Sequence, residues 1–286
     1  MGFKTQDIWL GLWRRAAPTA SLPVGRLKVR PVVSDAAMRA LTQWRPTWKT
    51  HLIARMLDRR PGTFVDVGAN VGQTLLDFLS AGSSGAYVGF EPNPTCHKHL
   101  ADFIAANALE QCVVVPAALG DRTGIATLHA GSEVDAGGTM LESLRPQLRR
   151  APTTVCMFRF DALAATLSQE PISVIKIDAE GAELEVLRGA ELTLADARPW
   201  IICEVLHRDA FADAGAYSER LANLRRFIAE AGYEIVRIVP SVEGATVAAL
   251  EDVDDFPDKV WDGTSERECD YLLVPAGQKP AARRLL

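Results

Sequence analysis

The sequence has few cysteines, and none of them is spaced as a metal-binding or redox pair. Of its 286 residues five are cysteine, and no two stand in a C-x-x-C arrangement. Such scatter is untypical of zinc sites and of disulfide frameworks. We therefore expect reduced, mostly buried thiols in a cytoplasmic protein. The five are Cys96, Cys112, Cys156, Cys203 and Cys269.

A long apolar run and an excess of basic charge are also missing. The stretch Met1–Ala17 contains an apolar segment that is too short for a membrane span, and its arginines follow that segment, unlike in a signal peptide. We expect a short helix that packs on the domain, with an interfacial helix as the alternative. The formal net charge of -5 argues against a nucleic-acid partner, which requires a basic surface.

What remains is an ordinary globular composition, with 48% hydrophobic and 23% charged residues. The length suits one sizeable α/β domain with additions. We expect an N-terminal arm over 1–46, a main domain over 47–275 with an insertion at about 124–170, and a loose C-terminal tail over 276–286. The sequence leaves open whether the chain forms a homo-oligomer.

The main domain is organised around the stretch 63–72. Phe64, Val65 and Val67 are apolar and β-favouring, which predicts a short buried strand. Gly68 and Gly72 then bracket a tight turn, and 73–79 continues as a helix. The unpaired N–H groups at the start of that helix attract polar or anionic ligand groups. A strand, a glycine-rich turn and a helix form the first half of a nucleotide-binding βαβ unit.

Asn70 distinguishes this turn from the dinucleotide-binding fingerprint, because it stands where the glycine that gives room to a pyrophosphate is required. Asp66 precedes the turn. An acid before such a turn suits a cationic ligand without phosphate, such as S-adenosylmethionine. An ordinary strand–helix turn is the alternative interpretation.

A second acid follows at the expected spacing. Residues 86–91 predict a strand that ends in Glu91, and Pro92 and Pro94 stop it. Glu91 lies roughly 20 residues past the glycines, the spacing at which a carboxylate binds ribose hydroxyls. We prefer that role to a solvated strand-end acid.

The rest of the main domain alternates between helical and strand patterns. The last strand, which arrives without a helix, is expected to pair antiparallel. Asp161 is expected to cap the helix that follows it. The acidic stretch 243–262 is expected to be an irregular connection, and the loop 131–148 is expected to form a substrate lid. Strands are predicted at 112–119, 124–130, 154–160, 172–178, 200–207, 233–239 and 269–274, and helices at 47–60, 95–109, 162–167, from 184, and at 217–230.

Acidic residues lie at or just after the ends of several of these strands. Because ligands bind beyond the carboxyl ends of strands in open α/β sheets, we expect these acids to share one site. Glu204 interrupts an apolar run, where a carboxylate needs a partner, and Lys176 is the candidate if the two strands are neighbours. His207 lies at the end of the same strand. Its role is that of a base, a substrate contact or a structural histidine, and the sequence leaves these alternatives open. The strand-end acids are Asp66, Glu91, Asp121 and Asp178.

Four motifs together resemble one known family. They are Asp66–Gly72, Phe90–Pro94, Ala118–Asp121 and Lys176–Glu183, the last being Lys-Ile-Asp-Ala-Glu-Gly-Ala-Glu. This set resembles the FkbM family of S-adenosylmethionine-dependent methyltransferases over about residues 50–240. The resemblance implies the α/β class I methyltransferase fold, a Rossmann-like three-layer sandwich. Its seven-stranded sheet is mostly parallel, with the last strand antiparallel.

The resemblance also implies roles at the site. The first motif would hold the methionine part of the cofactor, the second its ribose and the third its adenine, while Asp178 would lie beside the sulfonium and the acceptor hydroxyl. The cofactor-binding residues so implied are Asp66, Gly68, Ala69, Asn70, Gly72, Glu91, Pro92, Asp121 and Asp178.

The implied activity is O-methylation of a saccharide or natural-product hydroxyl. This reaction needs in-line geometry and a base, for which Asp178, Glu180 and His207 are the candidates. A divalent cation held by Asp178, Glu180 and Glu204 is a less favoured alternative, and we assign no metal ligand. The competing functions are an NAD(P)-dependent oxidoreductase on a similar sheet and a non-catalytic nucleotide-binding module.

Overall fold

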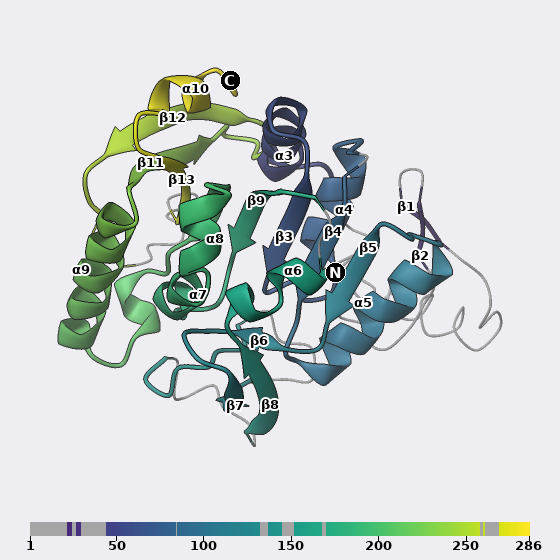
Figure 1. Cartoon of the computed structure of the whole chain (residues 1–286), viewed down its shortest axis with the longest axis horizontal. Coiled ribbons are helices and arrows are strands. Elements are labelled where there is room, and N and C mark those ends of the chain that lie inside the picture. The colour runs from purple at the N-terminus through teal and green to yellow at the C-terminus, as the bar shows by residue number, and fades with distance from the viewer. Residues whose placement is uncertain are drawn as a thin grey trace, which may run out of the picture.

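The computed structural model describes residues 22–24, 27–29, 44–83, 85–131, 137–144, 152–167, 170–257, 260 and 269–286 (Figure 1). The helix predicted for Met1–Ala17 lies outside these residues. In the predicted arm, β1 (Leu22–Val24) and β2 (Leu27–Val29) pair antiparallel.

The described strands form a central sheet in the order β12-β11-β13-β10-β9-β3-β4-β5. The five strands from β10 to β5 in this order run parallel, and β13 pairs antiparallel with both β10 and β11. The predicted class I methyltransferase arrangement is therefore confirmed. The bounds are β3 Thr63–Val67, β4 Tyr87–Phe90, β5 Cys112–Val115, β9 Ile172–Ile177, β10 Trp200–Glu204, β11 Tyr233–Pro240, β12 Val247–Val253 and β13 Asp270–Pro275.

The edge strand β12 is an addition to the predicted seven strands. The sequence predicted an irregular connection here, which is wrong over Val247–Val253, because these residues pair antiparallel with β11. Leu250 is buried. Glu251 lies opposite Arg237 on the paired strand, and the two side chains form an ion pair on the surface. Charged residues are typical of edge strands, and they obscured the alternating pattern.

Helices cover both faces of the sheet, as a three-layer sandwich requires (Figure 1). Alternate strand residues point to opposite faces, so Phe64 packs with the helices of one layer and Val65 with those of the other. No helix in the described part of the chain combines the length and apolar character needed to cross a membrane. One layer contains α3 (Trp48–Arg59), α4 (Gln73–Ser80), α5 (Pro94–Ala106) and α10 (Lys279–Arg283); the other contains α6 (Ala164–Leu167), α7 (Glu183–Gly189), α8 (Glu191–Asp196) and α9 (Ala214–Glu230).

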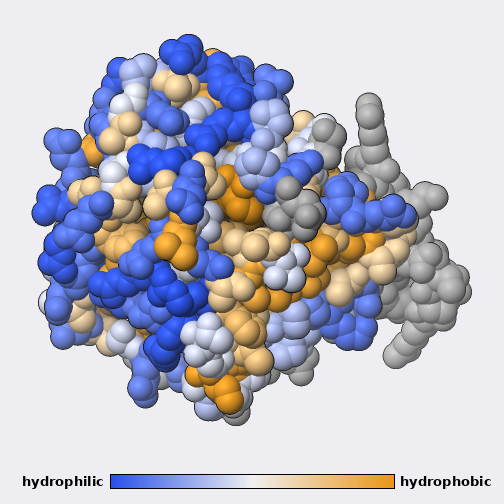
Figure 2. Space-filling view, in the orientation of Figure 1, coloured by the Kyte–Doolittle hydropathy of each residue, from blue (hydrophilic) through white to orange (hydrophobic). Residues whose placement is uncertain are grey.

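Helix α9 shows why this layering forms. Its outer surface, at the left of Figure 2, is hydrophilic. Tyr217, Leu221, Leu224 and Ile228 recur at helical spacing and are buried against the sheet.

The C-terminal residues differ from the expected loose tail. They form α10, in which Ala282 is buried, and the following Leu285 is buried as well. Figure 1 shows α10 beside β12. The sequence did not predict this because the helix is short and has few apolar residues.

The insertion forms a small sheet in the order β6-β8-β7, from β6 (Ala118–Leu119), β7 (Gly124–Leu128) and β8 (Thr153–Phe158). The strand predicted at 112–119 is divided at Pro116, which has no N–H for a ladder bond. Its first half, β5, stays in the central sheet.

The expected capping role of Asp161 is corrected. Asp161 lies in the 3₁₀ turn η2 (Phe160–Ala162), and its carboxylate accepts hydrogen bonds from the backbone N–H groups of Leu192 and Thr193. It therefore caps α8, which is distant in sequence, instead of the neighbouring α6.

Candidate functional site

A cavity of about 740 Å³ opens at the carboxyl ends of β3, β4, β9 and β10. This is the position at which open α/β sheets bind ligands, and the volume lies within the range of small-molecule sites. Of the residues predicted from the sequence, those that line the cavity are Gly68, Ala69, Asn70, Glu91, Pro92, Asp178 and Glu180.

The turn after β3 is shaped by close packing against the end of β9. Gly68 has φ of +78°, and a Cβ there would lie 2.0 Å from the carbonyl oxygen of Asp178. Asn70 has φ of +47°, which asparagine tolerates better than most residues. The left-handed backbone at Gly68 and Asn70 and the close approach of Gly68 to Asp178 keep the backbone of Gly68–Asn70 at the cavity wall.

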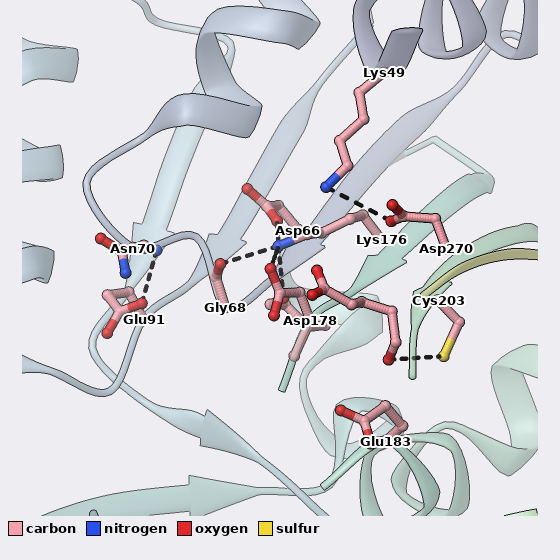
Figure 3. A network of polar contacts seen from close by, with 12 residues as sticks. Lys49, Asp66, Gly68, Asn70, Glu91, Lys176, Asp178, Glu183, Cys203 and Asp270 are labelled. Carbon is pink, nitrogen blue, oxygen red and sulfur yellow. Dashed lines mark hydrogen bonds and ion pairs between the residues drawn. The ribbon is translucent and has the colours of Figure 1, made fainter. Parts of the chain in front are cut away.

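Glu91 is fixed by the backbone on both sides. One carboxylate oxygen accepts a hydrogen bond from the N–H of Asn70 at 2.7 Å, and the other accepts from the N–H of Asn93 at 2.7 Å (Figure 3). Burial raises the pKa of Glu91 to about 7. Each oxygen retains acceptor capacity, so the carboxylate can also accept hydrogen bonds from ligand hydroxyls.

Asp66 stands behind the cavity wall. It is fully buried, accepts a hydrogen bond from the Tyr87 hydroxyl at 2.5 Å, and lies 3.3 Å from the Lys176 ammonium. The same ammonium lies 3.2 Å from Asp178 and donates to the carbonyl of Gly68 at 3.1 Å (Figure 3). Asp66 therefore positions Lys176, which in turn holds the glycine turn and Asp178.

Asp178, directly after β9, and Glu204, at the end of the neighbouring strand β10, both line the cavity. The charge of Asp178, together with burial, raises the pKa of Glu204 to about 9. Burial alone would raise the pKa of Asp178, but the ammonium groups of Lys176 and Lys49 lower it overall. Glu204 thus holds a proton at neutral pH, and Lys176, its expected partner, instead forms ion pairs with Asp66 and Asp178.

Two further charged groups in the cavity wall were not predicted. Lys49 extends from α3 toward Asp270 on β13, with 3.7 Å between Nζ and Oδ1 (Figure 3). Burial lowers the pKa of Lys49, but Asp270 and other carboxylates raise it more. Asp270 opens an otherwise apolar strand, and that was the available signal. Nothing in the amphipathic pattern of α3 marked Lys49.

Other predicted residues lie away from the cavity. Asp121 follows β6 beside Arg122, while the backbone of Ala117–Leu119 lines the cavity in the region expected for adenine. Gly72 caps the start of α4 with φ of +101° and faces Leu100. His207 lies beside the thiol of Cys269, 3.4 Å from Sγ to Nδ1.

Part of the predicted lid covers the turn after β9. Gly138 and Met140 line the cavity, and the Thr139 hydroxyl donates to the carbonyl of Glu180 at 2.7 Å. The residues 132–136 and 145–148 of the predicted lid lie outside the described residues. Among the described residues, no group of three or more histidine, cysteine, aspartate or glutamate side chains is arranged to hold a metal ion.

A family model matches more than half of the chain. The model of the methyltransferase FkbM domain matches residues 66–235. No protein of curated function matches the sequence. A methyltransferase FkbM from Methylobacillus flagellatus KT is similar in structure, with 16% identity, a TM-score of 0.45 and coverage of 85% of this chain and 56% of that chain. This chain therefore spans little more than half of that protein.

Two O-methyltransferase structures are similar at a comparable level. The O-methyltransferase from Bacillus cereus in complex with SAH has 13% identity and a TM-score of 0.43, with 93% of this chain and 97% of that chain covered. TomG from Streptomyces achromogenes, in complex with SAM, has 14% identity and a TM-score of 0.44, with 96% of this chain and 100% of that chain covered.

Proposed function

The chain belongs to the FkbM methyltransferase family, and from this premise we propose that it is an S-adenosylmethionine-dependent O-methyltransferase. The acceptor is a hydroxyl of a saccharide or natural product. The cavity described above holds both the cofactor and the acceptor.

The position of Glu91 carries this proposal. Its carboxylate lies in the cavity wall at the end of β4, and the N–H of Asn70 in the glycine turn donates to it. A carboxylate in this position accepts hydrogen bonds from the two hydroxyls of a ribose. The backbone of Gly68–Asn70 and the uncharged wall of Ala117–Leu119 extend to either side, which suits a nucleoside that carries no phosphate.

When bound, S-adenosylmethionine supplies an electrophilic methyl group. The acceptor hydroxyl loses its proton as the new oxygen–carbon bond forms, and Asp178 accepts that proton at its carboxylate. Lys176 fixes the orientation of Asp178 through the ion pair at 3.2 Å. Glu180 lines the same cavity and is the second candidate base, whereas His207 lies beside Cys269 and is set aside.

Calorimetric titration with S-adenosylhomocysteine tests the proposal. We expect the wild type to bind, and Glu91→Gln to bind at least tenfold more weakly, because a hydrogen bond to a charged group is replaced by a neutral one. Glu110→Gln, at an exposed acid before β5, is the matched control and should bind like the wild type. Failure of the wild type to bind, with or without magnesium, would overturn the proposal.

A further inference from the structure

One end of the cavity is built from segments outside the residues that match the family model. The match covers 66–235. Trp44 and Lys49 precede it, while Pro240, Gly244 and Asp270 follow it, and all five line the cavity. The N–H of Trp48 donates to the carbonyl of Gly244 at 3.0 Å, which ties the two flanking segments together.

This end lies opposite the part assigned to the cofactor. Glu91 and Ala117–Leu119 are at or after the ends of β4 and β5, toward one edge of the sheet. Asp270 lies on β13, on the far side of β9 and β10, with Asp178 between the two ends. A group bound near Asp270 would therefore approach Asp178 from the side away from the ribose.

The Lys49–Asp270 pair retains unused hydrogen-bonding capacity. The separation of 3.7 Å between Nζ and Oδ1 exceeds a normal hydrogen bond, and Asp270 Oδ1 has no hydrogen-bond partner among the described residues. Lysine offers three donors, and a carboxylate offers about four acceptor positions. A ligand hydroxyl can accept from Lys49 and donate to Asp270 at the same time, which an ether, a carboxylate or a fully ionised phosphate cannot do.

The charges of the wall disfavour an anionic acceptor. Both lysines that line the cavity already lie beside carboxylates: Lys176 beside Asp66 and Asp178, and Lys49 beside Asp270. Arg45 is exposed at the rim and donates to a backbone carbonyl. The carboxylic side chains that line the cavity are Asp77, Glu91, Asp178, Glu180, Glu204 and Asp270. Among the described residues that line the cavity, only Arg45 at the rim would add a positive charge to balance an anionic acceptor against these carboxylic groups.

We infer that Lys49 and Asp270 form an acceptor subsite that selects an uncharged, polyhydroxylated acceptor by binding a hydroxyl next to the one that is methylated. The inference rests on the proposed function and adds the residues and the charge that determine specificity. Trp44 lines the same cavity.

The test uses the full-length chain and pairs of probes in which a neutral sugar is compared with an anionic derivative of the same ring. Methyl glucoside and methyl glucuronide share a ring and differ at carbon 6, and glucose and glucose 6-phosphate form a second pair. Initial rates of S-adenosylhomocysteine formation give kcat/KM for each probe. We expect each neutral probe to exceed its anionic partner by about tenfold or more, the effect of losing a hydrogen bond to a charged group.

Variants then test the two residues. Lys49→Met and Asp270→Asn should raise the KM for the neutral probes by about tenfold or more, with Lys49→Arg partly restoring it, and should change the affinity for S-adenosylhomocysteine less than twofold. Lys98→Met and Asp102→Asn alter an exposed ion pair on α5 and serve as matched controls. The probe comparison on the wild type needs no variant, so it holds even if one variant folds poorly.

The outcomes separate this inference from the proposed function. Loss of all S-adenosylhomocysteine binding by the wild type would remove the proposed function. If the wild type binds S-adenosylhomocysteine normally, three results would each overturn the inference alone. They are a preference for the anionic probes, no turnover of any neutral probe, and an unchanged acceptor KM in both Lys49→Met and Asp270→Asn.

Discussion

Lys176 and Asp66 are directly opposite each other on the paired strands β9 and β3, and their charged groups lie 3.3 Å apart in the interior. Asp66 is fully buried, and the side chain of Lys176 is 5% exposed. Burial of either charge without the other would be strongly unfavourable. The pair thus makes the position of the glycine turn depend on the position of the strand that carries Asp178.

Replacing Lys176 with methionine should destabilise the fold. The substitution leaves the Asp66 carboxylate buried without a cation, and breaking a buried pair in this way costs about 3–5 kcal/mol. Urea unfolding followed by circular dichroism at neutral pH measures the loss. The double variant Lys176→Met with Asp66→Asn should lose less than the sum of the single variants, because position 66 then carries no charge that needs Lys176. Strict additivity would show that the two groups do not interact.

Much of this fold follows from local patterns in the sequence. Phe64–Val67 and Ile172–Ile177 are short runs made mostly of β-branched and aromatic residues, and such runs are typical of parallel strands buried on both faces. The helix spacing of Leu221, Leu224 and Ile228 was equally clear. The edge strand β12 was missed because half-exposed, charged strands carry little periodicity, and the cap at α8 was missed because Asp161 acts across about thirty residues of intervening chain.

The site was predictable where the ends of consecutive strands supply it. Glu91 and Asn70 of the glycine turn are 21 residues apart in sequence, and the structure brings them together at 2.7 Å. The Lys49–Asp270 pair joins residues from opposite ends of the chain, and no local pattern reports such proximity. Asp66 was predicted as a ligand-facing acid, yet it lies beneath Lys176, because a strand's alternation gives the face of a residue but not the depth of the cavity.

Asp178→Asn should preserve the fold and abolish most of the activity. Its side chain is 27% exposed, so an isosteric amide is tolerated, but the amide cannot accept a proton from the acceptor. We expect kcat to fall by about 10²-fold or more, the usual contribution of a positioned base. Steady-state rates with a turned-over acceptor, together with a melting curve, provide the measurement. Glu180→Gln is the comparison, and a larger fall in that variant would transfer the role of base to Glu180.

Glu183 should make stability depend on pH. It is buried, accepts a hydrogen bond from the N–H of Gly181 at 2.8 Å, and burial raises its pKa from 4.5 to about 7. Between these values the folded chain retains a proton that the unfolded chain has lost, so the stability falls as pH rises from about 4.5 to about 7 and stays lower above it. Glu183→Gln should reduce the loss between pH 5 and pH 8 by roughly 1–3 kcal/mol.

Urea titrations of Glu183→Gln and the wild type at both pH values give this difference. Glu110→Gln, at an exposed acid, is the control and should follow the wild type. Equal losses in the wild type and Glu183→Gln would show that Glu183 is ionised in the folded protein throughout this range.

His99 should lower the stability of the fold as the pH falls. It is fully buried on α5, and neither ring nitrogen has a hydrogen-bond partner among the described residues. Burial lowers its pKa from 6.5 to about 4, so below pH 6.5 the unfolded chain takes up a proton that the folded chain refuses. Stability is therefore lost as pH falls from 6.5 toward 4, by roughly 2 kcal/mol at pH 5.

His99→Leu should remove this part of the loss, which melting curves at pH 7.5 and 5.0 would measure. His51→Leu, at an exposed position of α3, should decline like the wild type, and a parallel decline of His99→Leu would mean that acid sensitivity arises elsewhere.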